Sequence, residues 1–437
     1  MSPTRREFVG RLTGGAALFG LASGGVAVAG CLSSGSDDPE PIDVDESELA
    51  AIAGITVPDV PETLPVSITD GHIENHRLRA EELLDAVPSD LGEIPNEAVR
   101  NYIAEERDSA RERLGRVDGN RPNFEQISTL TGSRRRAAEA EGAYAAARGE
   151  RLRMDVYDAA ESVRDRLSGL EDNLRRVGDV AHHAVVVYEE VEQRLERARR
   201  GLDRLDNTPP VTSEVTAVGE AASDLESVQA TLEVTSHILD GQSGDRTFDD
   251  EFERVARDLI DDLKDRSDVL PFDAENPGEE LFEASVAHTP RAEIGRVIRG
   301  GGRTARVDAV REQLDEGQSA GALLTLYRLE HLLRTVDHLQ ERVQEGAYGR
   351  PENAGDVRSV KQTAVEEIEA VLKNPDYPVP TRHRIQEAVS MVKYADGNLE
   401  SGRTEEVSVQ AMGQYAVATE QARTLPAATE WFVQRFA

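Results

Sequence analysis

The sequence is poor in the residue types that build several common kinds of site. It has one cysteine, Cys31, and one tryptophan in 437 residues, and aromatic residues make up only 4%. A single cysteine excludes an intramolecular disulfide, and it excludes the cysteine-rich zinc and iron–sulfur centres. Any functional site must therefore use other residue types.

Basic residues, and lysine above all, are scarce. The chain has 50 Lys and Arg against 83 Asp and Glu, a net charge of −33, and only four of its basic residues are lysines. Binding to phosphate backbones needs a basic patch, so nucleic acid is not expected as a partner. The composition resembles that of proteins from salt-loving archaea. At molar salt the Debye length falls to about 3 Å, so dense surface carboxylates repel one another little.

Long apolar runs are missing, except for one uncharged stretch near the start. Leu12–Gly30 is long enough to span a bilayer as a helix. Its six glycines are poor helix formers and add little apolar character, so it makes a weak span. We therefore expect a targeting segment that is removed, with an uncleaved signal anchor as the alternative.

Two motifs flank this stretch. The run TRREF at 4–8 resembles the twin-arginine export motif through Arg5, Arg6 and Phe8, although Gly10 stands where lysine is common. The run VAGC at 28–31 is similar to a lipobox, in which the cysteine is lipidated and becomes the first residue of the mature chain. The resemblance implies passage through the twin-arginine export machinery and a membrane anchor on Cys31. Two lipid chains on one cysteine would hold the protein stably on the outer face of the cytoplasmic membrane.

Composition and pattern divide the chain into four parts. Residues 1–30 are the signal segment, and residues 31–60 are predicted to be an acidic, disordered spacer. Residues 61–208 are predicted to be a helical domain containing a long hairpin, and residues 209–437 a second helical bundle. The boundary between the last two is placed at the run DNTPPVTSE, where paired prolines stop a helix.

Helical periodicity dominates after residue 70, which predicts an all-α, multi-helix bundle. The clearest pattern is a heptad seam: Ala160, Val163, Leu167, Leu170, Leu174 and Val177. It resumes after Gly178–Asp179 with apolar residues from Ala184 to Leu205. We expect two long helices in an antiparallel coiled-coil hairpin, with one unbroken rod as the alternative.

The same periodicity continues to the end of the chain. Eight further amphipathic helices are predicted, separated by turn signals, with the last one interrupted at Pro426: 213–240, 247–266, 278–288, 291–316, 318–345, 354–373, 381–401 and 404–436.

Histidines supply the candidate metal ligands. His331 and His338 lie two turns apart on one face of a predicted helix, with Glu330 beside them. Two other clusters have helical or adjacent spacing, namely His72 with His76, and His182 with His183. For each cluster the simpler interpretation is an ordinary surface or interior histidine.

Two further features have a structural and a functional interpretation. The run RGGGRTAR contains Gly300–Gly302, which either marks a hinge or forms an anion nest from successive backbone N–H groups. Trp431, Phe432 and Phe436 cluster at the C-terminus, where they either dock a helix into the core or contact a partner.

These observations predict a lipid-anchored helical protein outside the cytoplasm that binds or scaffolds an unidentified protein partner. Catalysis and a cofactor are not expected. The alternative is a surface lipoprotein that binds a metal or small ligand through Glu330, His331 and His338 and assists uptake.

The anchor assignment predicts that Cys31→Ser releases the protein into the medium, because serine cannot carry the thioether-linked lipid. Fractionation of cells into membrane and medium measures this, and Ser33→Ala, which leaves the cysteine intact, should stay with the membrane. A Cys31→Ser protein that remained membrane-bound would instead favour an uncleaved span.

Overall fold

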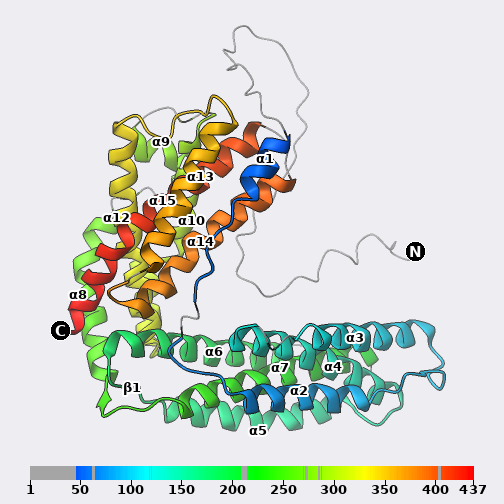
Figure 1. Ribbon diagram of the computed structural model, residues 1–437. Coiled ribbons are helices and arrows are strands. Elements are labelled where there is room, and N and C mark those ends of the chain that lie inside the picture. Colours follow the sequence, from blue (N-terminus) through cyan, green and yellow to red (C-terminus); the bar gives the residue numbers. More distant parts are fainter. Residues whose placement is uncertain are drawn as a thin grey trace.

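The computed structural model describes residues 46–437, except 62–63, 118, 120, 208–213, 269, 271–273, 284–285, 287, 374 and 402–404. Helices account for nearly all of its regular structure, which confirms the all-α, multi-helix bundle. They form two units, and the helices of one run across those of the other (Figure 1). Arg5, Arg6 and Phe8, predicted to form the export signal, and Cys31, the predicted anchor, lie outside the described residues.

The first unit holds the helices from α2 to α7. They are α2 (Asp70–Asp85), α3 (Glu97–Gly115), α4 (Asn123–Ala147), α5 (Arg153–Asp172), α6 (Ala181–Asn207) and α7 (Val215–Asp240).

The second unit follows a short two-residue pairing of β1 (Val177–Gly178) with β2 (Arg246–Thr247), which is antiparallel. Its helices are α8 (Asp249–Asp268), α9 (Pro277–Phe282), α10 (Pro290–Thr304), α11 (Val307–Asp315), α12 (Ser319–Gln344), α13 (Ala354–Lys373), α14 (Pro378–Ser401) and α15 (Glu405–Val433), and the 3₁₀ turn η1 (Gln434–Phe436) ends the chain.

Helix α7 is the centre of the first unit. It packs against α4, α5 and α6, and apolar and small residues are buried along its length. A helix that is surrounded on several sides needs no narrow apolar stripe. The helices therefore group differently from the predicted division at 208/209, because α7 joins the first unit, although the Pro209–Pro210 break itself lies outside the described residues.

The predicted hairpin is present. Helices α5 and α6 are antiparallel, since Tyr157 near the start of α5 donates a hydrogen bond to the carbonyl oxygen of Leu205 near the end of α6. The unbroken rod is wrong, because α5 ends at Asp172 and α6 begins at Ala181. The seam is also shorter than predicted, since Leu174 and Val177 lie beyond the end of α5.

Most later helices match the predicted ranges, with three exceptions. The helix predicted at 278–288 is shorter, because α9 ends at Phe282. The helix predicted at 291–316 is two helices, because α10 ends at Thr304 and α11 begins at Val307. The interruption expected at Pro426 is absent, and α15 continues through this residue. Gly300–Gly302 lie inside α10, so their N–H groups belong to a helix and form no anion nest.

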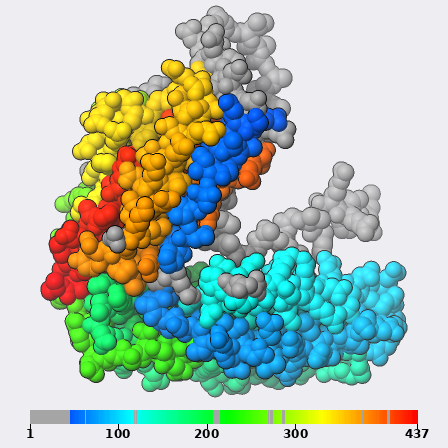
Figure 2. All heavy atoms as spheres, in the orientation of Figure 1, coloured from blue at the N-terminus to red at the C-terminus, as the bar shows by residue number. Residues whose placement is uncertain are grey.

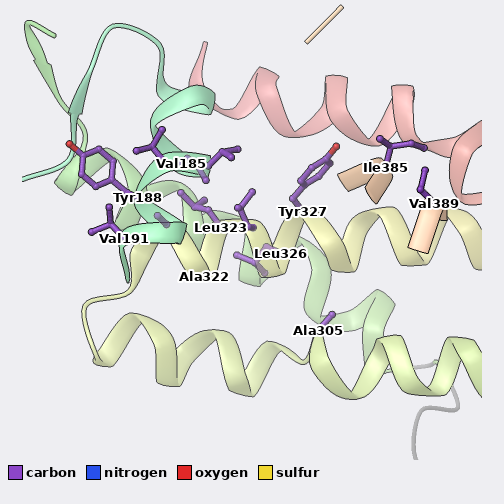
Figure 3. Packing of buried hydrophobic residues seen from close by; sticks show 14 of the residues in the cluster. Val185, Tyr188, Val191, Ala305, Ala322, Leu323, Leu326, Tyr327, Ile385 and Val389 are labelled. Carbon is purple, nitrogen blue, oxygen red and sulfur yellow. The ribbon is translucent and has the colours of Figure 1, made fainter. Parts of the chain in front are cut away.

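The two units share one continuous hydrophobic core. Figure 3 shows where they meet: Val185, Tyr188 and Val191 of α6 lie near Leu323 of α12, and Tyr327 lies farther along α12 in the same cluster. All five side chains are buried. The uncharged run in α6 that begins after His183 is therefore an interface between units, and its burial on both sides explains why it lacks a polar face.

A short helix, α1 (Glu46–Ala53), precedes both units and packs against α13 and α14. The chain then crosses the face of the second unit to reach the first, as Figure 2 shows. The predicted disordered spacer at 31–60 is therefore wrong for residues 46–53, since Leu49 and Ile52 are buried. Leu49 and Ile52 are three residues apart, as on one face of a helix, but the acidic composition of the segment led to the prediction of disorder.

A buried lysine fixes α1 to the second unit. Lys361 of α13 is fully buried, and its Nζ donates hydrogen bonds to the carbonyl oxygens of Ile52 at 2.8 Å and Ala53 at 2.9 Å. These carbonyls lie at the C-terminus of α1, beyond the reach of N–H groups within the helix, although that of Ile52 also accepts from the backbone N–H of Ile55 at 3.0 Å. The same Nζ lies 2.7 Å from the carboxylate of Asp396, which neutralises its charge.

None of the helices in the described ranges combines the length and apolar character that a bilayer crossing requires.

We predict that Lys361→Met frees α1 and lowers the free energy of unfolding by about 3–5 kcal/mol, because it leaves Asp396 without its cation and α1 without its cap. Limited proteolysis around residues 46–53 and thermal unfolding in molar salt measure the two effects. The control is Lys393→Met, which removes a half-exposed lysine of α14 whose carboxylate partner, Asp59, is also exposed. Equal behaviour of the two variants would contradict the role of Lys361.

Candidate functional site

A polar groove runs along the first unit, with α2 and α5 as its walls and α7 as its floor. It consists of two adjoining cavities of about 390 and 320 Å³. Arg79 of α2, Arg166 of α5 and Glu233 of α7 line both cavities. The other residues of the first cavity are His72, Asn75, His76, Ser236, His237 and Asp240, and those of the second are Arg134, Ser162, Val163, Gln229 and Leu232.

Close packing of α4 on α7 brings Arg134 under this groove. The helices approach through Gly142 and Gly219, where no side chain separates the two backbones. A Cβ at Gly142 would lie 2.7 Å from the Cβ of Ala222, and one at Gly219 would lie 2.7 Å from the carbonyl oxygen of Glu139. Only glycine fits at such distances.

Arg134 is 1% exposed and is bound by two carboxylates. Its Nε donates to Glu226 at 2.8 Å, and its Nη1 donates to Glu233 at 2.5 Å. Arg79 also donates to Glu226, at 3.1 Å from Nη2. A buried guanidinium is tolerated only with such pairing, so these residues form one structural network.

The same guanidinium fixes the protonation of His76, which is also 1% exposed. The Nη1 of Arg134 lies 3.1 Å from Nδ1 of His76, and since arginine can only donate, Nδ1 must accept. The proton of the neutral ring is therefore on Nε2. This N–H is buried without a hydrogen bond, although a carboxylate oxygen of Glu233 lies 3.5 Å away, and the residue lines the first cavity.

Two more histidines complete this end of the groove. The rings of His72 and His237 stack with centroids 4.2 Å apart, and Nε2 of His72 is buried without a partner. The backbone N–H of Thr69 donates to Nε2 of His237 at 3.2 Å, which places the proton of that ring on Nδ1. The groove thus presents imidazole N–H donors from two different helices.

Burial keeps the imidazoles of His76 and His72 neutral. It lowers the pKa of His76 to about 3, with the charge of Arg134 adding to the effect. Burial also lowers the pKa of His72 to about 4, and His237 contributes to that shift. At neutral pH both side chains are therefore uncharged.

Arg166 and Asp240 differ from the other charged residues of the groove. Arg166 donates through Nη2 to Oγ of Ser236 at 3.2 Å, and has no carboxylate within ion-pair distance among the residues that the structure describes. Asp240 lies one helical turn after Ser236. Among the residues that the structure describes, it has no basic side chain within ion-pair distance. Both are exposed and line the first cavity. The cavity therefore carries one charge of each sign without an ion-pair partner among the described residues, although the charge of Arg166 also acts on Glu233.

His331, predicted as a metal ligand, is buried in the second unit with both ring nitrogens engaged. Nδ1 accepts a hydrogen bond from Nε of Arg384 at 3.0 Å, and Nε2 donates to the carbonyl oxygen of Gln421 at 2.8 Å. Burial lowers the pKa of His331 to about 3, and the positive charge of Arg384 contributes to the same shift. This is the satisfied interior histidine of the simpler interpretation.

The other two predicted ligands have different partners. Nδ1 of His338 lies 2.6 Å from the carboxylate of Glu420, and Glu330 is bound by Arg266 and Arg334. The structure thus does not bring Glu330, His331 and His338 to a common point. Across its described ranges, it holds no group of three His, Cys, Asp or Glu side chains that could bind a metal ion.

The remaining sequence candidates have structural roles. His182 and His183 lie edge to face, and His182 also contacts Tyr377 before α14. Phe432 is buried and stacks on Tyr327. Phe436 packs edge-on against the ring of Phe432. The C-terminal aromatic cluster therefore docks the last helix into the core.

One motif escaped the sequence analysis. Gly317–Gly321 has Gly-x-Ser-x-Gly spacing, but here it leads into α12, which begins at Ser319. Ser319 is 2% exposed, and the N–H groups of Ala320 and Gly321 donate to the carboxylate of Glu192. The spacing reflects a helix start capped by a carboxylate of α6.

Most residues of the groove were also missed. Only His72 and His76 were singled out, because their four-residue spacing is visible in one helix. Arg134, Arg166 and Glu233 come from three other helices and have no local pattern. The unpartnered Nε2 of His76 depends on a side chain 58 residues away, so no window of sequence reveals it.

Outside the groove, the buried carboxyl group of Glu189 lies where the two units meet. It is 8% exposed and accepts a hydrogen bond from Gln193. Burial, reinforced by the neighbouring Glu190, raises the pKa of Glu189 to about 7, although Arg328 of α12 opposes the shift. In the unfolded chain this carboxyl ionises near its ordinary value of 4.5, so the folded state binds the proton more tightly.

We predict that wild-type stability falls, relative to Glu189→Gln, as the pH rises from about 4.5 to above 7. The raised pKa of Glu189 means that ionisation costs the folded state up to about 3 kcal/mol, and the amide avoids this cost. Thermal unfolding across this pH range, at constant salt, measures the difference. Glu81→Gln, on the exposed face of α2, should follow the wild-type curve, and a Glu189→Gln curve parallel to wild type would contradict the assignment.

Comparison with known protein families divides the chain near the start of α8. Residues 71–250 match a family described as "Domain of unknown function (DUF8262)", and residues 249–434 match "Domain of unknown function (DUF8264)". These ranges correspond closely to the two helical units of the structure. Neither the curated proteins nor the solved structures contain a significant match.

Proposed function

We propose that the chain is a lipid-anchored binding protein on the outer face of the cytoplasmic membrane, and that it holds a small polar ligand in the groove between α2 and α5. The observation that carries the proposal is the buried N–H of His76, which has no hydrogen-bond partner and belongs to a residue that lines a cavity of about 390 Å³. Buried polar groups are almost always hydrogen-bonded, so an exception that borders a cavity calls for an explanation such as a functional role or a bound water. A cavity of this size is within the range of small-molecule sites.

The location of the protein in this proposal rests on the opening segment. Cys31 precedes Glu46 by 15 residues, which can extend over at most about 50 Å. The lipid would thus hold α1 close to the membrane, and Lys361 would transmit that attachment to the second unit. The groove belongs to the first unit, whereas α1 packs on the second.

Of the two ligand classes considered from the sequence, the geometry favours a small molecule over a metal ion. A metal ion that binds a histidine needs the free lone pair of a ring nitrogen. At His76 the lone pair is on Nδ1 and is occupied by Arg134, while Nε2 carries a proton. The side chain can therefore donate to an oxygen of a ligand and cannot coordinate a cation in this arrangement.

The test compares two tryptophan variants of α2 in the full-length chain, purified from membranes in molar salt. Asn75→Trp fills the first cavity without removing a protein hydrogen bond, whereas Glu81→Trp places the same bulk on an exposed face outside it. Mass spectrometry then identifies small molecules retained by each protein. We expect a compound that is retained by wild type and Glu81→Trp and lost from Asn75→Trp. Identical retention by all three proteins would contradict the proposal.

A further inference from the structure

We propose that the ligand of the groove is a small zwitterion of the α-amino-acid type, with its carboxylate on Arg166 and its ammonium group on Asp240. This inference rests on the proposed function and adds the chemical class of the ligand.

The charges of the groove favour a ligand with both signs. Arg79 and Arg134 are already paired with Glu226, and Glu233 is paired with Arg134. The charges left over are the guanidinium of Arg166 and the carboxylate of Asp240. A simple anion would leave Asp240 unpaired and close to its own charge, and a simple cation would do the same at Arg166.

The spacing of these charges suits a compact ligand. Arg166 is held against Ser236 of α7 by its Nη2, and Asp240 follows Ser236 by four residues, a rise of about 6 Å along the helix. Both side chains line the same cavity, which has room for more than the two charged groups. Arginine binds a carboxylate through two parallel N–H groups, and its Nε and Nη1 have no acceptor among the described residues.

The histidines supply the neutral part of the recognition. The Nε2–H of His76 makes no hydrogen bond, the carboxylate of Glu233 being 3.5 Å away, and the tautomer of His237 leaves a second donor on Nδ1. A ligand carboxylate has more lone pairs than one guanidinium can satisfy. The N–H of His76 can therefore bind the carboxylate oxygen that Arg166 leaves free.

Three probes separate the two charges of the ligand. L-serine carries both charges, glycerate replaces the ammonium group by a hydroxyl, and ethanolamine lacks the carboxylate. Isothermal titration calorimetry of the full-length wild-type chain, at one molar chloride concentration, should rank L-serine above each of the other two by about tenfold or more. Glycerate or ethanolamine binding as tightly as L-serine would overturn the proposal.

Two variants assign each charge to its residue. Asp240→Asn should remove the preference for L-serine over glycerate, and Arg166→Met should remove the preference for L-serine over ethanolamine. Their controls are Asp165→Asn and Arg164→Met on α5, neither of which lines the groove. The controls should keep wild-type affinities within about twofold. All four side chains are exposed or half-exposed, so the variants should fold, which circular dichroism checks.

The outcomes also separate this inference from the proposed function. If no probe binds, but wild type retains a compound that Asn75→Trp loses, the zwitterion assignment fails and the binding function stands. If no probe binds and Asn75→Trp changes nothing, both fail. Preferences that persist in Asp240→Asn and Arg166→Met would also overturn the assignment.

Discussion

The groove depends on the buried guanidinium of Arg134. This one side chain binds Glu226 and Glu233 of α7 and fixes the proton of His76 on α2, so it connects three helices in a region where each charge needs a partner. Removing one partner of such a network costs more than the network contributes over an apolar core. The arrangement therefore serves to position groups at the groove, and the close glycine contact of α4 with α7 makes it sterically possible.

Two other buried charges join parts of the molecule that are distant in sequence. Lys361 holds the helix nearest the predicted anchor. Arg176 binds Glu192 of α6, Asp249 at the start of α8 and the carbonyl oxygen of Gly317 before α12, so it joins the two units beside their shared core. In a chain with a net charge of −33, the many exposed ion pairs contribute little at high salt. The buried pairs are screened much less, which suits them to hold the architecture together.

Local sequence patterns predicted the positions of most helices. They could not predict which helices pack together or which residues form long-range contacts. The 3.6-residue period placed most helices, and the heptad residues from Ala160 to Leu167 identified the hairpin. The same pattern could not show that α7 packs with the first unit, because the prolines before it mark a break in the helix and say nothing of its partners. It also could not reveal that Lys361 is buried, since its acceptors lie more than 300 residues earlier.

The candidate site shows the same limit more sharply. The spacing of His331 and His338 predicted a metal site, yet each ring faces a different partner, Gln421 or Glu420. The spacing of His72 and His76 was equally visible and leads to the groove. What distinguishes the two clusters is whether a buried nitrogen lacks a partner, and this depends on helices that pack from elsewhere in the chain.

The most direct test of the account is a crystal structure of the full-length chain grown in molar salt with L-serine. The account predicts the amino acid between Arg166 and Asp240, with its carboxylate within hydrogen-bond distance of Nε2 of His76. An empty groove at a saturating concentration, or a ligand bound elsewhere on the molecule, would contradict it.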